Sequence, residues 1–111
     1  MEIRTETRDG ITIVEIVGNI DSNTAPQAQG TIMPLIDPNC LLVLDMEQCH
    51  YVSSAGLRVL LMIAKLIATK VGQCALANVS DEVKDVMEIT GFASFFKTYD
   101  TVATAIEAFQ K

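Results

Sequence analysis

The amino-acid sequence predicts one α/β domain, residues 1–111, in which a mixed β-sheet carries its helices mainly on one face. The chain opens with two strand-like segments joined by a tight turn, which predicts a β-hairpin. After the hairpin, helical and strand-like segments alternate to the end of the chain. Such alternation is typical of strands that pair in parallel through helical crossovers. An antiparallel start followed by parallel strands makes the sheet mixed.

The composition narrows the functional classes. Of the 111 residues, 50% are hydrophobic and 20% are charged, as is typical of a compact globular domain and not of a disordered chain. One domain of this length leaves no room for a substrate domain beside a cofactor domain, and we expect no cofactor. The net charge of -6 argues against direct nucleic-acid binding, which needs a basic surface. It favours a protein partner with a basic face.

The cysteines and the apolar runs bear on the cellular setting. Cys40, Cys49 and Cys74 are odd in number and show no C-x-x-C spacing, so neither a disulfide framework nor a zinc site is indicated. The first residues lack the apolar region of a signal peptide. The apolar run at residues 59–64 is far too short to span a bilayer. We therefore expect a cytoplasmic protein without membrane insertion.

The first two strands are predicted at residues 3–7 and 11–17, because β-branched residues dominate the second and alternate loosely in the first. Asp9 and Gly10 lie between them. An Asp-Gly pair is a strong signal of a two-residue hairpin turn of type I′, because both central positions of that turn need a positive φ angle.

The first helix is predicted to begin near Thr24, because Thr24 and Gln27 have the spacing of a capping box. Pro34 is expected to kink it by crowding the carbonyl group of Gly30. One face of this helix is apolar and consists of Ala25, Ala28, Ile32 and Leu35.

A continuous apolar run at residues 40–44 predicts a central strand that is buried on both faces of the sheet. The helix expected at residues 55–70 is apolar around most of its circumference, and we expect Met62 and Leu66 to belong to the core. So broadly apolar a helix could also leave an exposed edge to which a partner docks. Its polar residues are Arg58, Lys65, Thr69 and Lys70.

The remaining elements follow from similar signals. Residues 73–77 resemble another strand, and Ser80 is a suitable N-cap for a helix that ends before Gly91. A short edge strand is expected at residues 95–99 and a last helix at residues 101–110. The predicted order is therefore β-β-α-β-α-β-α-β-α.

The most informative segment is the strand-to-helix turn that carries Ser53 and Ser54. The N-terminus of a helix has unpaired backbone N–H groups and a positive dipole end, so it favours an anion such as a serine-linked phosphate. The neighbouring residues supply neither a general base nor a metal site. The turn is therefore interpreted as a switch on which another protein acts, and the chain is not expected to be an enzyme.

Three segments resemble the STAS domains of anti-sigma factor antagonists: residues 18–21 (Gly-Asn-Ile-Asp), 42–45 (Leu-Val-Leu-Asp) and 51–61 (Tyr-Val-Ser-Ser-Ala-Gly-Leu-Arg-Val-Leu-Leu). In that family the motif before Gly-Leu is Asp-Ser-Ser or Asp-Ser-Ala, and the serine after the Asp accepts a phosphate. The resemblance thus implies phosphorylation at Ser54, and Ser53 stands where the family has Asp.

The resemblance also implies a partner-switching cycle. The unphosphorylated antagonist binds an anti-sigma factor that is also an ATP-dependent serine kinase, which frees the sigma factor. Phosphorylation ends the binding, and a metal-dependent serine phosphatase restores the active form. The family also includes subunits of stressosomes and of lipid-transport ABC systems, so an interaction subunit without phosphorylation is the alternative. The residues expected to contact the partner are Asp21, Ser53, Ser54, Gly56 and Arg58.

Structural roles for the same residues remain open at this point. Ser54 could cap the helix, Asp21 could be a turn residue, and Arg58 could be an ordinary solvent-facing charge. A nucleophilic serine is disfavoured because Val52 replaces the first glycine of a G-x-S-x-G elbow. His50 has no second ligand at metal-site spacing, so we expect no metal.

Overall fold

The computed structural model describes residues 1–110. Its elements follow the predicted order, with two short 3-10 helices, η1 and η2, in addition. The strands are β1 (Glu2–Arg8), β2 (Ile11–Val17), β3 (Leu41–Asp45), β4 (Gln73–Ala77) and β5 (Lys97–Tyr99). The helices are α1 (Ala25–Ile32), η1 (Met33–Leu35), α2 (Ser54–Thr69), α3 (Asp81–Thr90), η2 (Phe92–Phe95) and α4 (Val102–Phe109).

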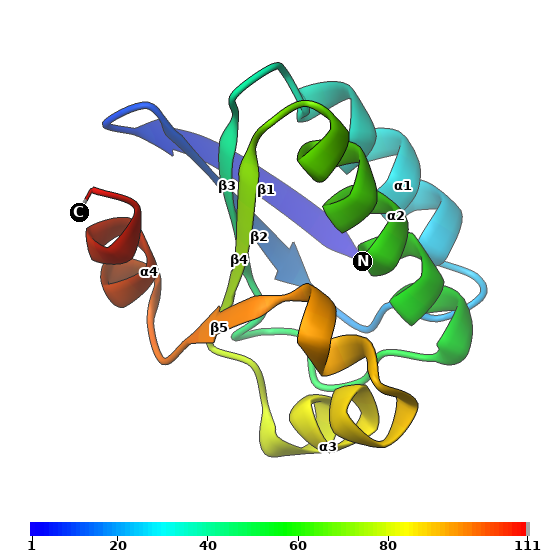
Figure 1. The fold of residues 1–111 in the computed structure, drawn as a ribbon. Coiled ribbons are helices and arrows are strands. Elements are labelled where there is room, and N and C mark those ends of the chain that lie inside the picture. The colour runs from blue at the N-terminus through cyan, green and yellow to red at the C-terminus, as the bar shows by residue number, and fades with distance from the viewer. Residues whose placement is uncertain (111) are drawn as a thin grey trace.

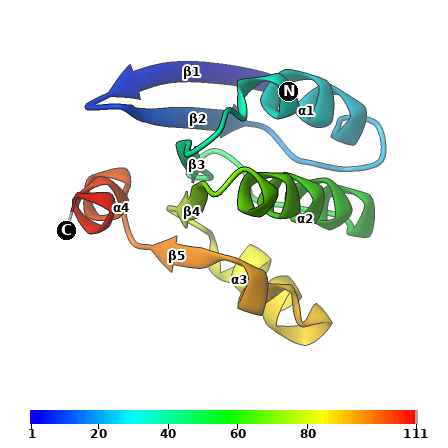
Figure 2. The same ribbon diagram turned by 45° about the horizontal axis from the view of Figure 1, so that its top comes forward.

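The strands form one five-stranded sheet in the order β1-β2-β3-β4-β5 (Figures 1 and 2). β1 and β2 are antiparallel, whereas β2, β3, β4 and β5 are mutually parallel, so the sheet is mixed as predicted. The register aligns Val14 with Leu44 and Leu44 with Leu76. β3 is therefore the central strand, which explains why its sequence is a continuous apolar run.

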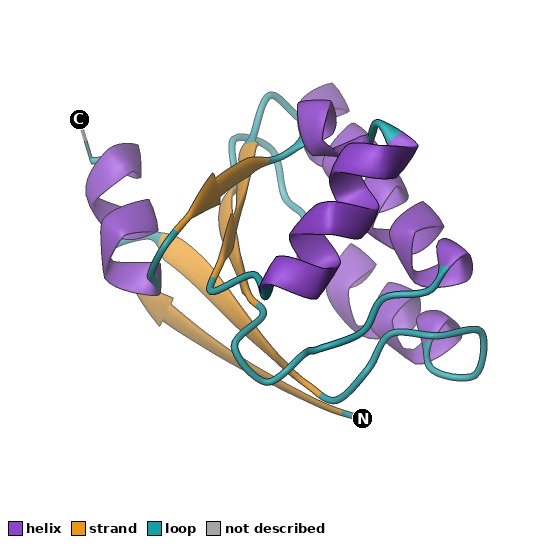
Figure 3. Cartoon of the chain, turned by 90° about the horizontal axis from the view of Figure 1, so that it is seen from below, coloured by secondary structure: helices purple, strands orange, loops and turns teal. Residues whose placement is uncertain are grey.

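The helices are distributed unequally over the two faces of the sheet. Figure 3 shows α4 alone on one side of the strands and the other helices together on the opposite side, which confirms the predicted arrangement. The larger core lies between the sheet and α1, α2 and α3. A smaller cluster joins the other face of the sheet to α4 and contains Ile11, Ile13, Val43, Ala75, Ala77 and Ala105.

The hairpin turn has the predicted geometry. Asp9 and Gly10 have φ angles of 52° and 79°, as a type I′ turn requires at both central positions. This turn twists in the same sense as the strands, and it fixes the register that pairs Arg8 with Ile11.

The start of α1 differs from the predicted capping box. The side chain of Thr24 caps no N–H group of α1. Its hydroxyl instead accepts a hydrogen bond from the N–H group of Asp21 over 2.9 Å and donates to the carbonyl group of Asn19 over 2.8 Å. Gln27 reaches the carbonyl oxygen of Met1. The N–H groups of Asn23 and Thr24 are satisfied by Asp21, at 2.9 and 3.1 Å from Oδ1. The carboxylate of Asp21 therefore holds the turn that leads into α1, including the N–H group of the N-cap residue Thr24.

The effect of Pro34 also differs in detail from the predicted kink. α1 ends at Ile32, and the chain tightens into η1, which contains Pro34. Because a proline inside a helix removes a backbone donor and crowds the preceding turn, ending the helix avoids both penalties. Leu35 thus lies in η1, where it is half-buried against the core.

Two further expectations need correction. The last strand begins at Lys97, because Phe95 belongs to η2. Met62 is 40% exposed and does not belong to the core, whereas Leu66 is partly buried against it. Four residues separate Met62 from Arg58, so both lie on the same outer face of α2.

The cysteines are free thiols. Cys49 is buried, and Cys40 and Cys74 are half-buried. Burial raises the pKa of Cys74 to about 12, so this thiol stays protonated at neutral pH.

Candidate functional site

The serine turn lies at the ends of the parallel strands, between β3 and α2. The connection from β3 is anchored by Met46 and Val52, whose side chains are buried. The N–H group of Met46 also donates to the carbonyl group of Ala77 over 2.9 Å, which ties the connection to the end of β4. The link into α2 is therefore held at its beginning and at its end.

The loop after β2 is bound directly to the serine turn. Ile20 and Val52 form an isolated parallel β-bridge. The N–H group of Ile20 donates to the carbonyl group of Tyr51 over 3.0 Å, and the N–H group of Ser53 donates to the carbonyl group of Ile20 over 2.9 Å. This pairing brings together the two motifs that sequence analysis selected from different parts of the chain, residues 18–21 and 51–61.

Gly56 makes that close approach possible. A Cβ atom at this position would lie 2.5 Å from the carbonyl oxygen of Ile20 and 2.9 Å from a side-chain carbon of Val52. Real Cβ atoms essentially never come that close. The structure thus explains the glycine by packing between two loops, and the role of buried Gly56 in partner binding stays a prediction.

The two serines have different structural roles. Ser53 has extended backbone angles, and its Oγ accepts a hydrogen bond from the N–H group of Gly56 over 3.2 Å, so Ser53 is the N-cap of α2. Ser54 is the first helical residue and is exposed. Within residues 1–110 its hydroxyl takes part in none of the side-chain hydrogen bonds. The cap is therefore Ser53, and the hydroxyl of Ser54 is left accessible.

Asp21 follows Ile20 and therefore lies next to the paired backbones. Its carboxylate accepts hydrogen bonds from the N–H groups of Thr24 and Asn23, and these bonds, led by that of Thr24, lower the pKa of Asp21 below its ordinary value. The group is charged at neutral pH. Its Oδ1 is occupied by the turn that leads into α1, which is the structural role that the sequence analysis left open for this residue.

Arg58 lies four residues after Ser54 on α2, so both side chains emerge from one face of the helix. Met62 continues the same line. We call Ser54, Arg58 and Met62 the serine stripe; all three side chains are exposed. Tyr51, just before the turn, is 53% exposed. The sequence analysis did not select Tyr51 as a site residue, and it placed Met62 in the core with an exposed docking edge as the alternative. The four-residue spacing from Arg58 to Met62 was visible in the sequence.

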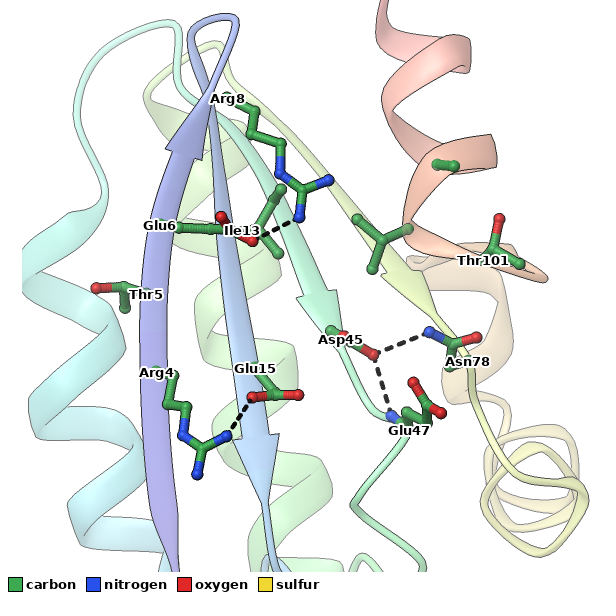
Figure 4. A pocket seen from close by; sticks show the side chains of 12 residues that line it. Arg4, Thr5, Glu6, Arg8, Ile13, Glu15, Asp45, Glu47, Asn78 and Thr101 are labelled. Atoms are coloured by element: carbon green, nitrogen blue, oxygen red, sulfur yellow. Dashed lines mark hydrogen bonds and ion pairs between the residues drawn. The ribbon is translucent and has the colours of Figure 1, made fainter.

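A groove of about 710 Å³ lies elsewhere, between the face of β1 and β2 and the start of α4 (Figure 4). At its edge, Asp45 Oδ1 accepts hydrogen bonds from the amide group of Asn78 and the backbone N–H of Glu47. None of the predicted site residues lines this groove. In the part of the chain that the structure describes, no group of three or more His, Cys, Asp or Glu residues could hold a metal ion.

The sequence matches the family described as STAS domain over residues 2–105. The chain belongs to the STAS domain family. BtrV of Bordetella bronchiseptica, provisionally named an anti-sigma factor antagonist, is 32% identical over an alignment of 111 residues that covers 99% of this chain and 96% of BtrV. The anti-sigma F factor antagonist of Paenibacillus polymyxa is 26% identical over an alignment of 108 residues that covers 96% of this chain and 92% of that protein.

A solved STAS structure has the same fold. The anti-sigma factor antagonist SpoIIAA in its unphosphorylated form has a TM-score of 0.80 at 18% identity, covering 98% of this chain and 96% of its own. Its phosphorylated form, from Bacillus, has a TM-score of 0.73 at 17% identity and covers 97% and 99%. The family match thus confirms the resemblance inferred from the motifs.

As for membranes, no helix within residues 1–110 is both long and apolar enough to cross one.

Proposed function

We propose that this STAS domain is an anti-sigma factor antagonist that is switched by phosphorylation of Ser54. In its unphosphorylated state it binds an anti-sigma factor that is also a serine kinase. Phosphate on Ser54 ends the binding, and a serine phosphatase reverses the modification. The observation that carries the proposal is the exposed hydroxyl of Ser54 at the first position of α2, beside a different residue that caps the helix.

The capping by Ser53 supports this assignment. The side chain of Ser53 accepts the hydrogen bond from Gly56, and serine and aspartate are both strong N-cap residues. Serine at position 53 can therefore maintain the same turn as the aspartate of the family motif. The replacement of this aspartate by Ser53 removes a negative charge beside Ser54, and the N-terminus of α2 stays capped.

The local electrostatics also suit a phosphate. The first turn of α2 contains no acidic residue, so a phosphate there would meet no neighbouring carboxylate within the helix. An anion at a helix N-terminus is stabilised by about 0.3–1 kcal/mol. The phosphorylated domain should therefore fold like the unphosphorylated one, and the modification should act on partner binding.

The serine stripe supplies a surface on which the switch could act. Met62 offers an exposed apolar contact and Arg58 an exposed cation, with Ser54 at the end nearest Tyr51. A phosphate adds about -1.5 to -2 charges. Placed in a contact that a partner desolvates, such a charge costs several kcal/mol, and each 1.4 kcal/mol corresponds to about tenfold in affinity.

The test begins with affinity purification of the wild-type domain from its own cells, followed by mass spectrometry of bound proteins and of phosphopeptides. The purified partner is then titrated calorimetrically with wild type, Ser54→Ala and Ser54→Asp. We expect Ser54→Asp to bind at least about tenfold more weakly and Ser54→Ala to bind like wild type while resisting phosphorylation. Equal affinities of the two folded variants would contradict the switch.

One observation favours a second function, that of an interaction subunit without phosphorylation. The residue before Ser54 is Ser53, and the family motif has Asp there. Such a subunit would bind a transport ATPase or a multimeric assembly through the same surface at all times. Constant co-purification with such a complex, without phosphate on Ser54 in any growth state, would support this function over the switch.

A further inference from the structure

β1 is an edge strand with a regular pattern of charges. It pairs with β2 on one side, and residues 1–110 contain no strand on its other side (Figure 2). The residues whose side chains face the α4 side alternate in sign: Glu2, Arg4, Glu6 and Arg8. Figure 4 shows Arg4, Glu6 and Arg8 on this side of β1, with Thr5 pointing away from them.

These charges already form ion pairs within the chain. Arg4 lies 2.8 Å from Glu2 and 3.3 Å from Glu15 on β2, and Arg8 lies 2.7 Å from Glu6. The pairs leave the exposed edge lined by charges in the order minus, plus, minus, plus. Natural proteins often protect edge strands with charged side chains, especially lysine, or with proline. The charges of β1 alternate in sign, so two copies of this edge can be complementary to each other.

From this pattern we propose that β1 is a homodimerisation edge that pairs antiparallel with β1 of a second copy, centred on Thr5. In that register Glu2 lies opposite Arg8 of the other copy, and Arg4 lies opposite Glu6. Opposite charges directly across a strand pair are favourable. The proposal concerns an edge that is separate from the serine turn, and it does not depend on the proposed function.

The same pattern rejects the neighbouring arrangements. A parallel pair in register would place Arg4 opposite Arg4 and Glu6 opposite Glu6. An antiparallel pair centred on Arg4 or on Glu6 would also oppose like charges, which is destabilising. The antiparallel register centred on Thr5 is the one with full overlap in which every charge of the strand meets its opposite.

The backbone fits this register. A type I′ hairpin is closed by a hydrogen-bonded pair, here Arg8 with Ile11, and such pairs alternate along an antiparallel ladder. The free N–H and C=O groups at the outer edge therefore belong to Ile3, Thr5 and Thr7. Centring on Thr5 places Thr5 opposite Thr5 and Ile3 opposite Thr7, so each of these pairs can exchange two hydrogen bonds.

The expected dimer is weak. A stable interface buries about 800 Å² on each partner, and one pair of seven-residue strands provides less than that. The net charge of -6 on each copy also opposes association, although about 0.15 M salt screens it beyond about 8 Å. Dimerisation should therefore be visible as a concentration-dependent equilibrium in sedimentation velocity at that salt concentration.

Charge variants of β1 test the proposal. The variant Arg4→Glu/Arg8→Glu has an all-acidic edge and should be monomeric, and Glu2→Arg/Glu6→Arg has an all-basic edge and should also be monomeric. A mixture of the two should form a heterodimer. The fourfold exchange, which combines these substitutions, restores complementarity and should dimerise. Lys65→Glu/Lys70→Glu, in α2 and directly after it, makes the same change in net charge as the all-acidic variant and should dimerise like wild type.

Amide hydrogen exchange locates the contact. Ile3, Thr5 and Thr7 should gain protection as the concentration of the wild-type protein rises, and circular dichroism should show every variant to be folded. The proposal is overturned if the wild-type protein stays monomeric up to millimolar concentration. It is also overturned if the all-acidic variant dimerises without the all-basic variant, or if a dimer forms in which these three amides gain no protection.

Discussion

Replacing Gly56 by alanine is expected to force apart the two loops that build the serine turn. The new methyl group would lie 2.5 Å from the carbonyl oxygen of Ile20. That oxygen belongs to the backbone and also accepts the 2.9 Å hydrogen bond from Ser53, so it cannot retreat without stretching this bond. The substitution therefore affects the packing of the turn and its hydrogen bonding together.

The magnitude follows from three contributions. Overpacking a well-packed site costs about 1–3 kcal/mol, and weakening one hydrogen bond costs up to about 1 kcal/mol more. The greater helix propensity of alanine offsets at most about 1 kcal/mol. We expect Gly56→Ala to lower the free energy of unfolding by about 1–3 kcal/mol.

Urea denaturation followed by circular dichroism measures this change, and Gly30→Ala is the matched control. Gly30 lies inside α1, and a Cβ atom there would have no neighbour within 4 Å. That substitution should raise stability by about 0.5–1 kcal/mol. If Gly56→Ala were as stable as Gly30→Ala, the close contact between Gly56 and Ile20 would not exist and the description of the turn would be wrong.

Two further predictions concern the residues around this contact. Ser53→Ala should lower the free energy of unfolding by about 1 kcal/mol through loss of the cap on Gly56, and Ser54→Ala should change it by less than about 0.5 kcal/mol; urea titrations of both decide which serine is the cap. Because its folded pKa is lowered, Asp21 stabilises the fold above its unfolded pKa of about 3.9, and this contribution is lost as the pH falls through the folded pKa. The free energy of unfolding of Asp21→Asn should therefore fall less steeply in this acid range. A decline as steep as that of wild type would show that the charge of Asp21 does not stabilise the turn before α1.

The elements that the sequence predicts well are those whose signal is local. Asp9 and Gly10 determine the hairpin through their backbone angles, and the apolar run before Asp45 identifies the central strand through its burial on both faces. The STAS motifs likewise place Ser54 at a strand-to-helix turn. In each case a few neighbouring residues contain the whole physical reason.

The predictions that fail concern side chains whose hydrogen-bond or packing partner lies outside the local pattern, or whose neighbour in the chain has the same chemistry. Thr24 and Gln27 have the spacing of a capping box, but the N–H group of Thr24 donates to the carboxylate of Asp21 and the side chain of Gln27 donates to the carbonyl group of Met1. Two adjacent serines are equally suited to cap α2, and the backbone angles of Ser53 decide between them. The exposure of Met62 depends on how the neighbouring helices cover α2, which the local pattern left open.

The contact between Ile20 and the serine turn explains why two separate motifs accompany one accessible hydroxyl. The carbonyl group of Ile20 binds the N–H group of Ser53 and packs against Gly56, so the loop after β2 fixes the direction in which α2 begins. Asp21, at the next position, holds the turn that leads into α1. A charge added at Ser54 would meet a turn that is held from both sides and cannot easily rearrange around it. The proposed phosphate would therefore alter the surface presented to a partner while the fold beneath it stays the same.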